Sequence, residues 1–230
     1  MWYCVLALVL AAEPTPGSAE ALFKQQEQQL LKSKTFQSEL EIALTPGKDN
    51  SMKGRLLLAQ GNKMRMDLAG SFMGKEGKVS MISDGTTMRM TSNDLPSKDQ
   101  AATKELSLIG FASLSRAGIF VPLFMSVKTK APGEKPDPFD IDKQLAISDL
   151  KLGKKEMVAG KETQALEYKL LLKSSPEPFL VTLWLDTKTH LPVKRVLTAK
   201  KDKEELTVTE TYTKAVSDEK IADKEFALPK

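Results

Sequence analysis

Side chains of the types that usually carry out catalysis are scarce in this chain of 230 residues, which has one His and one Cys. Asp186 and His190 lie close together after an apolar run, a pair that could transfer a proton or activate a hydroxyl. Polar residues in that position, however, most often form a solvated turn. A Ser–Lys site or a site with two carboxylates is not excluded by the sequence, but no spacing of residues indicates one. We therefore expect no catalytic residue, no metal site and no cofactor.

The overall composition is that of an ordinary globular protein. Hydrophobic residues make up 41% of the chain and charged residues 28%, which excludes a disordered polymer and a polytopic membrane protein. Lys and Arg number 34 against 30 Asp and Glu, and the two signs alternate along most of the chain. A nucleic-acid-binding protein would show a clustered basic stripe, so we expect no nucleic-acid partner.

The N-terminal residues 1–12 form an uncharged apolar run that is too short to span a bilayer but fits the hydrophobic region of a signal peptide. Small residues allow cleavage after Ala11, Ala12 or Ala19, so we expect a signal peptide at 1–19 and a single domain at 20–230. No Lys or Arg precedes the run, which leaves a buried N-terminal strand as the alternative. Cys4 precedes every cleavage position, and a mature chain without Cys suits an oxidising compartment.

Alternation of apolar and polar residues, which is typical of half-buried strands, begins at residue 35 after a predicted helix at 19–34. Further strands are predicted at 52–59, 63–68, 78–81, 87–90, 150–159, 163–173, 179–185, 191–199 and 204–213. Between the two sets, residues 99–127 predict two short helices and 128–138 a solvated loop. A membrane span at 106–127 is the alternative, but Arg116 and Pro122 disfavour it.

A sheet of about ten antiparallel strands curls more readily than it lies flat, because twist accumulates from strand to strand. We therefore expect a mainly β fold with some α: a strongly curved antiparallel sheet, or unclosed half-barrel, with helices against its concave face. The Lys- and Glu-rich residues 200–205 predict a solvated hairpin end, with docking on a partner or on anionic lipid as the alternative.

Methionine is concentrated in one part of this pattern. Seven of the ten Met fall between Met52 and Met90, and alternation places most of them on the apolar face. Met is unbranched and polarizable, so it suits surfaces that must accept more than one ligand shape. The alternative is that these residues form an ordinary core.

Several short stretches resemble one family in their order and spacing around the helical insertion. They are Gly54-Arg55-Leu56 with Asn62-Lys63-Met64-Arg65-Met66, then Ile82-Ser83-Asp84-Gly85-Thr86-Thr87-Met88, Leu183-Trp184-Leu185-Asp186-Thr187-Lys188-Thr189-His190-Leu191-Pro192 and Asp223-Lys224-Glu225-Phe226-Ala227-Leu228-Pro229. Together they resemble the outer-membrane lipoprotein-sorting, or lipoprotein carrier (LolA-like), proteins. The resemblance implies an unclosed antiparallel barrel whose helical lid covers an apolar cavity that shelters acyl chains in the periplasm.

On this resemblance and the alternation, the ligand cavity is expected to be lined by Leu40, Ile42, Met52, Leu56, Leu58, Met64, Met66, Met81, Met88, Met90, Leu170 and Leu183. The lid is expected to comprise Leu108, Phe111, Leu114, Ile119 and Phe120. In the resembled family an arginine just after the second strand bonds to the lid helix. The matching position here is Gln60, an uncharged residue, so the resemblance implies a looser latch.

The functional hypothesis is a noncatalytic periplasmic carrier that binds the acyl chains of lipoproteins and shuttles them towards the outer membrane. Its expected partners are an acylated lipoprotein or other lipid ligand and transport proteins in the inner and outer membranes, and we expect a monomer. An envelope-stress sensor or regulatory lipid- or protein-binding module on the same fold is the first alternative. An unrelated secreted enzyme is the second.

Overall fold

The computed structural model describes residues 15, 17–46, 50–72, 74–93, 97–102, 105–120, 140–173, 175, 177–201 and 204–229. Its described strands are β1 (Thr35–Thr45), β2 (Ser51–Ala59), β3 (Lys63–Phe72), β4 (Lys75–Asp84), β5 (Thr87–Ser92), β6 (Lys98–Ala101), β7 (Leu145–Val158), β8 (Lys161–Leu172), β9 (Phe179–Asp186), β10 (Pro192–Lys201) and β11 (Glu204–Ser217). The helices are α1 (Ala19–Lys32), α2 (Leu106–Arg116), α4 (Ile141–Gln144) and the 3₁₀ helix η1 (Asp223–Phe226).

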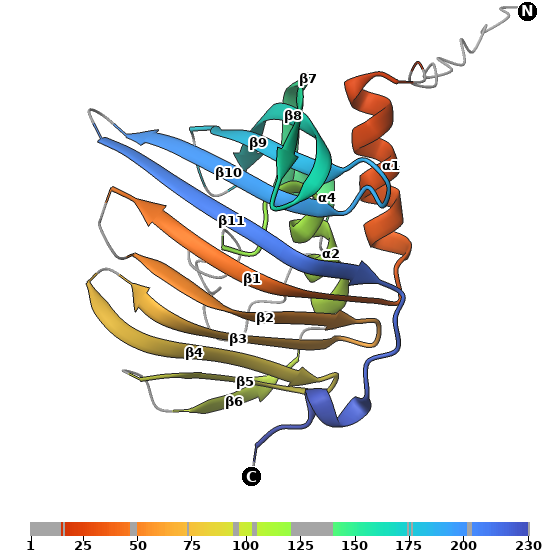
Figure 1. Cartoon of the computed structure of the whole chain (residues 1–230). Coiled ribbons are helices and arrows are strands. Elements are labelled where there is room, and N and C mark those ends of the chain that lie inside the picture. The colour runs from red at the N-terminus through yellow and green to blue at the C-terminus, as the bar shows by residue number, and fades with distance from the viewer. Residues whose placement is uncertain are drawn as a thin grey trace, which may run out of the picture.

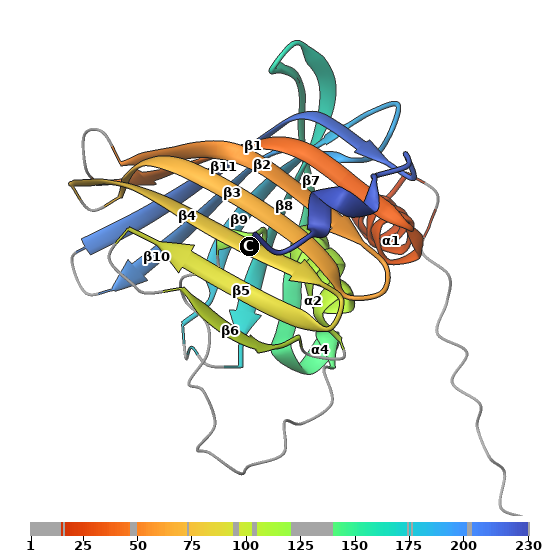
Figure 2. The same cartoon turned by 90° about the horizontal axis from the view of Figure 1, so that it is seen from below.

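The strands form one antiparallel sheet in the order β6-β5-β4-β3-β2-β1-β11-β10-β9-β8-β7. The chain builds one wing from β1 outwards to β6, crosses to the far edge, and returns from β7 to β11, which pairs with β1 (Figure 1). The sheet curves around α2 without closing (Figure 2). The expected unclosed, strongly curved sheet is therefore confirmed, with eleven strands rather than about ten.

Two glycines let neighbouring strands approach closely where the sheet bends. A Cβ atom at Gly54 would lie 1.7 Å from the backbone oxygen of Asp67, and one at Gly70 would lie 2.1 Å from that of Ser51. No larger residue fits at either position without moving the adjacent strand. The close approach of β2 and β3 therefore depends on residues that have no side chain.

The core lies on the concave face, under α1 and α2. In β1 the buried residues alternate from Phe36 to Leu44, as the sequence pattern predicts. Helix α1 begins at the N-cap Ser18, whose Oγ accepts a hydrogen bond from Ala21 N, and packs Phe23 edge-on against Tyr168 in β8. Helix α2 approaches β2 so closely that a Cβ at Gly110 would lie 3.1 Å from Leu58 Cδ2.

The C-terminal residues pack against the opposite, outer face of the sheet as a short strap. Phe226 of η1 is buried against Leu57 and Ala59, whose side chains lie on the outer face of β2. Arg55 Nη1 bonds to Glu225 Oε2 at 2.9 Å, which ties the strap to the same strand. The segment that the sequence resemblance singled out near the C-terminus thus covers the sheet rather than contributing to the concave face.

The structure corrects the start of the predicted helical region. Residues 98–101 form strand β6 although 100–105 are rich in helix formers, because pairing with β5, from Met90↔Lys98 to Thr87↔Ala101, outweighs local propensity. The second predicted helix and the predicted loop fall largely in residues 121–139, outside the described residues. Within the described part of the chain, no helix is long and apolar enough to cross a membrane.

Candidate functional site

A row of apolar side chains crosses the concave face from strand to strand. Leu56 pairs with Met66, Met66 with Met81, and Met81 with Met90, so these four side chains lie side by side on one face. Their exposure rises along the row, from 0% at Met66 to 38% at Met90. The row therefore runs from the core beneath α2 to an accessible wing formed by β4 and β5.

The other predicted cavity residues divide in the same way. Nine of the expected lining residues are buried in one core cluster: Leu40, Ile42, Met52, Leu56, Leu58, Met64, Met66, Leu170 and Leu183. Met81 and Met88 are half-buried, and Met90 is exposed. In this conformation most of the predicted lining is packed as core, and the accessible end of the row lies at β4 and β5.

Helix α2 and the turn after it cover this core. Of the expected lid residues, Phe111, Leu114, Ile119 and Phe120 are buried in the same cluster. Leu108 is 43% exposed, so it adds little to the cover. Four of the five expected lid residues therefore lie in the core beside the sheet, and Leu108 faces solvent.

Gln60 is not the residue whose side chain bonds α2 to the sheet. Gln60 Nε2 donates to Ser33 O at 3.3 Å, because the β2–β3 turn lies beside the connection from α1 to β1. The bond to the covering helix comes instead from Arg195 in β10, whose Nη2 donates to Leu114 O at 2.6 Å and to Ser115 O at 3.2 Å. Gln60 is thus bonded to the α1–β1 connection, and the side chain bonded to the carbonyls of α2 is the charged, fully buried Arg195.

A carboxylate completes the attachment from the neighbouring strand. Glu210 Oε1 accepts hydrogen bonds from Ile119 N at 2.8 Å and Phe120 N at 2.6 Å, and its Oε2 accepts one from the Tyr212 hydroxyl. Arg195 Nη1 lies 3.6 Å from Glu210 Oε2, and both side chains are fully buried. Burial raises the pKa of Tyr212 well above its usual range, so the hydroxyl keeps its proton and donates a hydrogen bond to Glu210.

The turn at Gly118 is shaped to admit this carboxylate. Gly118 has φ +78°, and a Cβ atom there would lie 2.0 Å from Glu210 Oε2. The positive φ favours glycine, and the close approach requires it.

The last turn of α2 is held from two further directions. Arg116 pairs with Glu27 of α1 at 2.6 Å and donates to Leu145 O at 3.0 Å, while the Tyr168 hydroxyl donates to Arg116 O at 2.6 Å. The carbonyls of Leu114 and Ser115 thus accept from the Arg195 guanidinium, and that of Arg116 accepts from a tyrosine hydroxyl. Positive groups at this position suit the negative end of a helix dipole. We call Arg195, Glu210, Tyr212, Tyr168 and Arg116 the buried polar cluster.

The buried polar cluster is not fully satisfied. Among the described residues, Arg195 Nε and Nη1 have no hydrogen-bond acceptor, and both amide atoms of the buried Gln26 in α1 lack partners. Buried polar groups without partners reduce the net stability of a packed interface. Attachment of α2 to the sheet is therefore specific in geometry but less favourable than apolar packing of the same area would be.

Sequence reasoning missed the two central members of this cluster, although a signal was present. Strand alternation places Arg195 between Val193 and Leu197, and Glu210 between Val208 and Tyr212, on the face where every neighbour is buried. Opposite charges at apolar-face positions of two strands indicate a buried pair once the strands are known to be neighbours. That adjacency, with Arg195 directly opposite Glu210, is what the structure adds.

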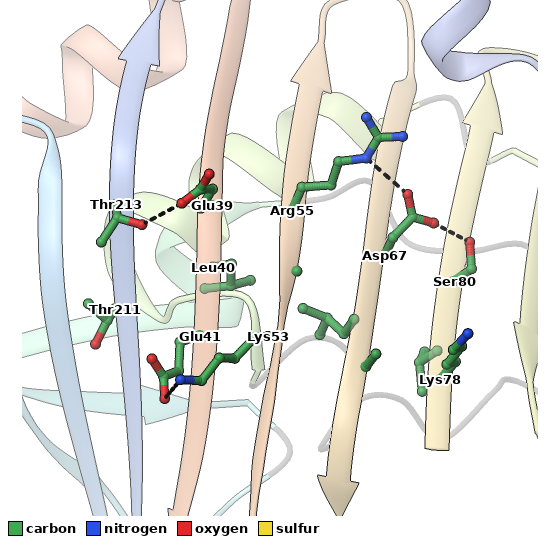
Figure 3. A pocket seen from close by; sticks show the side chains of 14 residues that line it. Glu39, Leu40, Glu41, Lys53, Arg55, Asp67, Lys78, Ser80, Thr211 and Thr213 are labelled. Carbon is green, nitrogen blue, oxygen red and sulfur yellow. Dashed lines mark hydrogen bonds and ion pairs between the residues drawn. The ribbon is translucent and has the colours of Figure 1, made fainter. Parts of the chain in front are cut away.

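The outer face carries a pocket of about 750 Å³ between β11 and β4 (Figure 3). Several of its charges are paired: Lys53 pairs with Glu41 at 3.1 Å, and Asp67 accepts from Arg55 at 3.1 Å and from Ser80 Oγ at 2.7 Å. Partial burial alone would raise the pKa of Asp67, but hydrogen bonds from Ser80, Arg65 and Arg55 lower it, so the carboxylate stays ionised. A lining of paired charges suits an acyl chain poorly.

Asp186 and His190 form the turn that the sequence predicts. Asp186 Oδ1 accepts from the backbone N–H groups of Lys188 and Thr189, and its other oxygen pairs with Lys161 at 3.1 Å. His190 has φ +54° and lies 3.2 Å from Gln25 Nε2 through its Nδ1. Asp186 thus bonds to the backbone of its own turn and to Lys161 of β8, whereas His190 bonds to Gln25 of α1. The two side chains therefore have different partners.

The similarity of this chain to known proteins lies in its structure and not in its sequence. No protein-family model matches the chain, and no curated protein matches it by sequence. The crystal structure of LprF from Mycobacterium bovis superposes with a TM-score of 0.53 at 9% identity, covering 92% of this chain and 97% of that one. The chain shares the fold of LprF.

Two other solved structures superpose on this chain with lower TM-scores. MucB matches at 0.47 with 18% identity, covering 94% of this chain and 65% of that one. A putative outer membrane lipoprotein-sorting protein domain from Vibrio parahaemolyticus matches at 0.37 with 11% identity, covering 91% and 95%. At 9% identity the likeness to LprF concerns the fold alone, so the evidence on function is the concave face of the chain itself.

Proposed function

We propose that this chain is an exported, noncatalytic carrier that binds the acyl chain of a lipid-modified protein, or a similar lipid, between α2 and the concave face of the sheet. The observation that carries the proposal is the row from Leu56 to Met90, which joins the core beneath α2 to an accessible wing. An acyl chain entering at β5 would meet methionine on β5, β4 and β3 and leucine on β2. Flexible thioether side chains can repack around chains of different length.

Binding along the whole row requires α2 to move, because the inner part of the row is fully buried. Moving α2 breaks the bonds from Arg195 to Leu114 O and Ser115 O and those from Glu210 to Ile119 N and Phe120 N. Closure of α2 thus competes with the ligand for the same apolar surface. The buried polar cluster sets how strongly it competes.

This competition gives the carrier a means of release. Each methylene transferred from water contributes about 0.8 kcal/mol, so a chain of about 14 methylenes gains on the order of 10 kcal/mol before costs are subtracted. Part of that gain is offset by separating α2 from the sheet, which lowers the net affinity. We propose the periplasm as the location and proteins of the inner and outer membranes as the exchange partners.

Binding of a fluorescent fatty acid tests the proposal in the purified protein. Met90→Glu places a charge at the accessible end of the row, and Thr91→Glu places the same charge on the opposite face of the same strand, where it is also exposed. We expect Met90→Glu to weaken binding at least tenfold, because about 1.4 kcal/mol of lost contact suffices, and Thr91→Glu to have little effect. Equal losses in both variants would contradict the site.

Native mass spectrometry of the protein from its own envelope separates the proposal from its alternatives. A carrier copurifies with acylated lipoprotein in stoichiometric amount. Copurification of a membrane-anchored protein that carries no acyl group in the concave face would instead favour a sensor or regulatory module.

A further inference from the structure

The C-terminal end of α2 presents backbone amide groups to two buried charged side chains. Arg195 donates to two carbonyls in the last turn of the helix, at 2.6 and 3.2 Å. Glu210 accepts from two backbone N–H groups in the turn that follows, at 2.8 and 2.6 Å. The two side chains lie directly opposite each other on β10 and β11. The cation therefore binds carbonyl oxygens, and the anion beside it binds N–H groups.

Movement of α2 would leave both charged groups without these partners. Arg195 and Glu210 are fully buried, and their cross-strand neighbours on the same face are the apolar Leu183 and Ile42. A charged group on an apolar surface without hydrogen bonds is costly. A ligand that restores the lost hydrogen bonds therefore binds more tightly than one that offers apolar contact alone.

Arg195 has donors that α2 does not use. Among the described residues, its Nε and Nη1 atoms have no hydrogen-bond acceptor although the side chain is fully buried. A guanidinium carries five N–H donors in a fixed plane, and α2 engages only Nη2. An oxygen atom of a ligand can therefore bond to donors that remain unpaired when α2 is in place.

The chemistry of the pair distinguishes among the groups that can end an acyl chain. An amide offers a carbonyl oxygen for Arg195 and an N–H group for Glu210, as the backbone of α2 does. Arg195 Nη1 lies 3.6 Å from Glu210 Oε2, so one amide group can reach both side chains. An ester has the carbonyl but no N–H, and a fatty acid brings a negative charge that Glu210 repels.

The pair is continuous with the apolar row on the concave face. Glu210 is opposite Ile42 of β1, and Ile42 is opposite Met52 of β2, which shares its face with Leu56. Leu56 is the first residue of the row that leads to β5. A ligand whose polar end lies at the pair can therefore extend its tail along buried apolar side chains towards the methionines.

We propose that Arg195 and Glu210 form a head-group site that selects acyl chains joined through an amide, as in an N-acylated peptide, over acyl esters and free fatty acids. The inference rests on the proposed function, because the pair becomes accessible only when α2 moves. The carbonyl of the ligand then replaces those of α2 at Arg195, and its N–H replaces those at Glu210. Helix and ligand compete for hydrogen bonds as well as for apolar surface.

Displacement of a fluorescent fatty acid by three ligands with the same tail tests the inference: myristic acid, its methyl ester and its N-methyl amide. Ester and amide differ in one group, the N–H that replaces the ester oxygen. We expect the amide to bind at least tenfold more tightly than the ester, because the ester leaves Glu210 unpaired, and the acid to bind no more tightly than the ester. Equal affinities would overturn the inference and leave the proposed function standing, whereas failure of all three to bind would overturn both.

Glu210→Gln tests the carboxylate, because it removes the charge and keeps the shape of the side chain. The amide and the ester should then bind within threefold of each other, and the acid should bind more tightly than the ester, since Arg195 meets the carboxylate without an opposing charge. Glu41→Gln is the matched control, because Glu41 pairs with Lys53 at 3.1 Å on the outer face, and it should keep the order of the parent. An unchanged order in Glu210→Gln would overturn the assignment. The ligand series in the parent protein decides the inference even where this variant does not fold.

Arg195→Met tests the cation through a ratio of affinities. Loosening α2 should strengthen the binding of every ligand, but only the amide also loses a contact with Arg195. The ratio of amide affinity to fatty-acid affinity should therefore fall about tenfold relative to the parent. An equal gain for the two ligands would show that Arg195 bonds to α2 and not to the ligand, which would overturn the inference.

Discussion

Replacing Arg195 by Met removes the side chain that joins β10 to the C-terminal end of α2. The substitution keeps an unbranched apolar stem but deletes two hydrogen bonds to helix carbonyls, of 2.6 and 3.2 Å, and a charge 3.6 Å from Glu210. A hydrogen bond from a charged donor contributes about 1.5–3 kcal/mol, and breaking a buried ion pair costs about 3–5 kcal/mol. We take about 3 kcal/mol as the loss that falls on the attachment of α2.

A weakened attachment raises the population in which α2 is away from the sheet. Because the apparent dissociation constant of a ligand equals its intrinsic value divided by the competent fraction, about 3 kcal/mol corresponds to an affinity gain of about a hundredfold. Arg195→Met should therefore bind a fluorescent fatty acid more tightly and release it more slowly, while the protein itself melts at a lower temperature. Amide hydrogen exchange in α2 should accelerate in the absence of ligand.

Arg65→Met is the matched control, because Arg65 is an outer-face arginine that bonds to Asp67 at 2.6 Å and to Glu225 O at 2.9 Å. It should lower stability without changing fatty-acid affinity. If Arg195→Met left affinity and α2 exchange unchanged, or weakened binding while circular dichroism stayed native, Arg195 would not oppose ligand entry and the reasoning would be refuted.

Other predictions follow from the fold. Gly54→Ala should destabilise the protein by at least about 1–3 kcal/mol by overpacking against Asp67 O, whereas Gly77→Ala, which meets only Asn93 Nδ2 at 3.8 Å, should not, as thermal melts will show. Because the folded-state pKa of Asp67 is lowered from 3.8, its contribution is present above that value and lost as pH falls through the lowered pKa. Asp67→Asn should therefore flatten the acid side of a urea-midpoint profile. Cleavage after Ala19 would remove the Ser18 cap, worth about 1 kcal/mol, so the intact mass of the exported protein should correspond to cleavage after Ala11 or Ala12.

Much of the sheet could be predicted because its signal is local. Alternation from Phe36 to Leu44 and across residues 179–185 gave both the strands and the face that each buries. Strand β6 could not be found in this way, since its residues favour helix and only the free edge of β5 makes them a strand. Local pattern is therefore a good guide to the buried faces and a poor one at the sheet edge.

The face on which the apolar candidate residues lie could be predicted from the sequence, whereas the polar residues bonded to α2 could not. Periodicity placed the methionines on one face, and register then aligned them into a row. The attachment of α2 depends on Arg195 and Glu210 becoming neighbours across β10 and β11, and on both reaching a segment far away in the sequence. The family motif pointed to Gln60 because it gives only a position along the chain. In the structure the bond to α2 comes from Arg195 on β10, which is far from Gln60 in the sequence.

The methionines themselves offer the most direct test of acyl binding on the concave face. Nuclear magnetic resonance of protein with ¹³C-labelled methionine methyl groups, titrated with a fatty acid, reports on each position separately. We predict that Met81, Met88 and Met90 shift first and that Met66 follows as α2 moves, while Met157, an exposed residue of β7, stays unchanged. Shifts confined to Met157, or none at all at saturating fatty acid, would contradict the account.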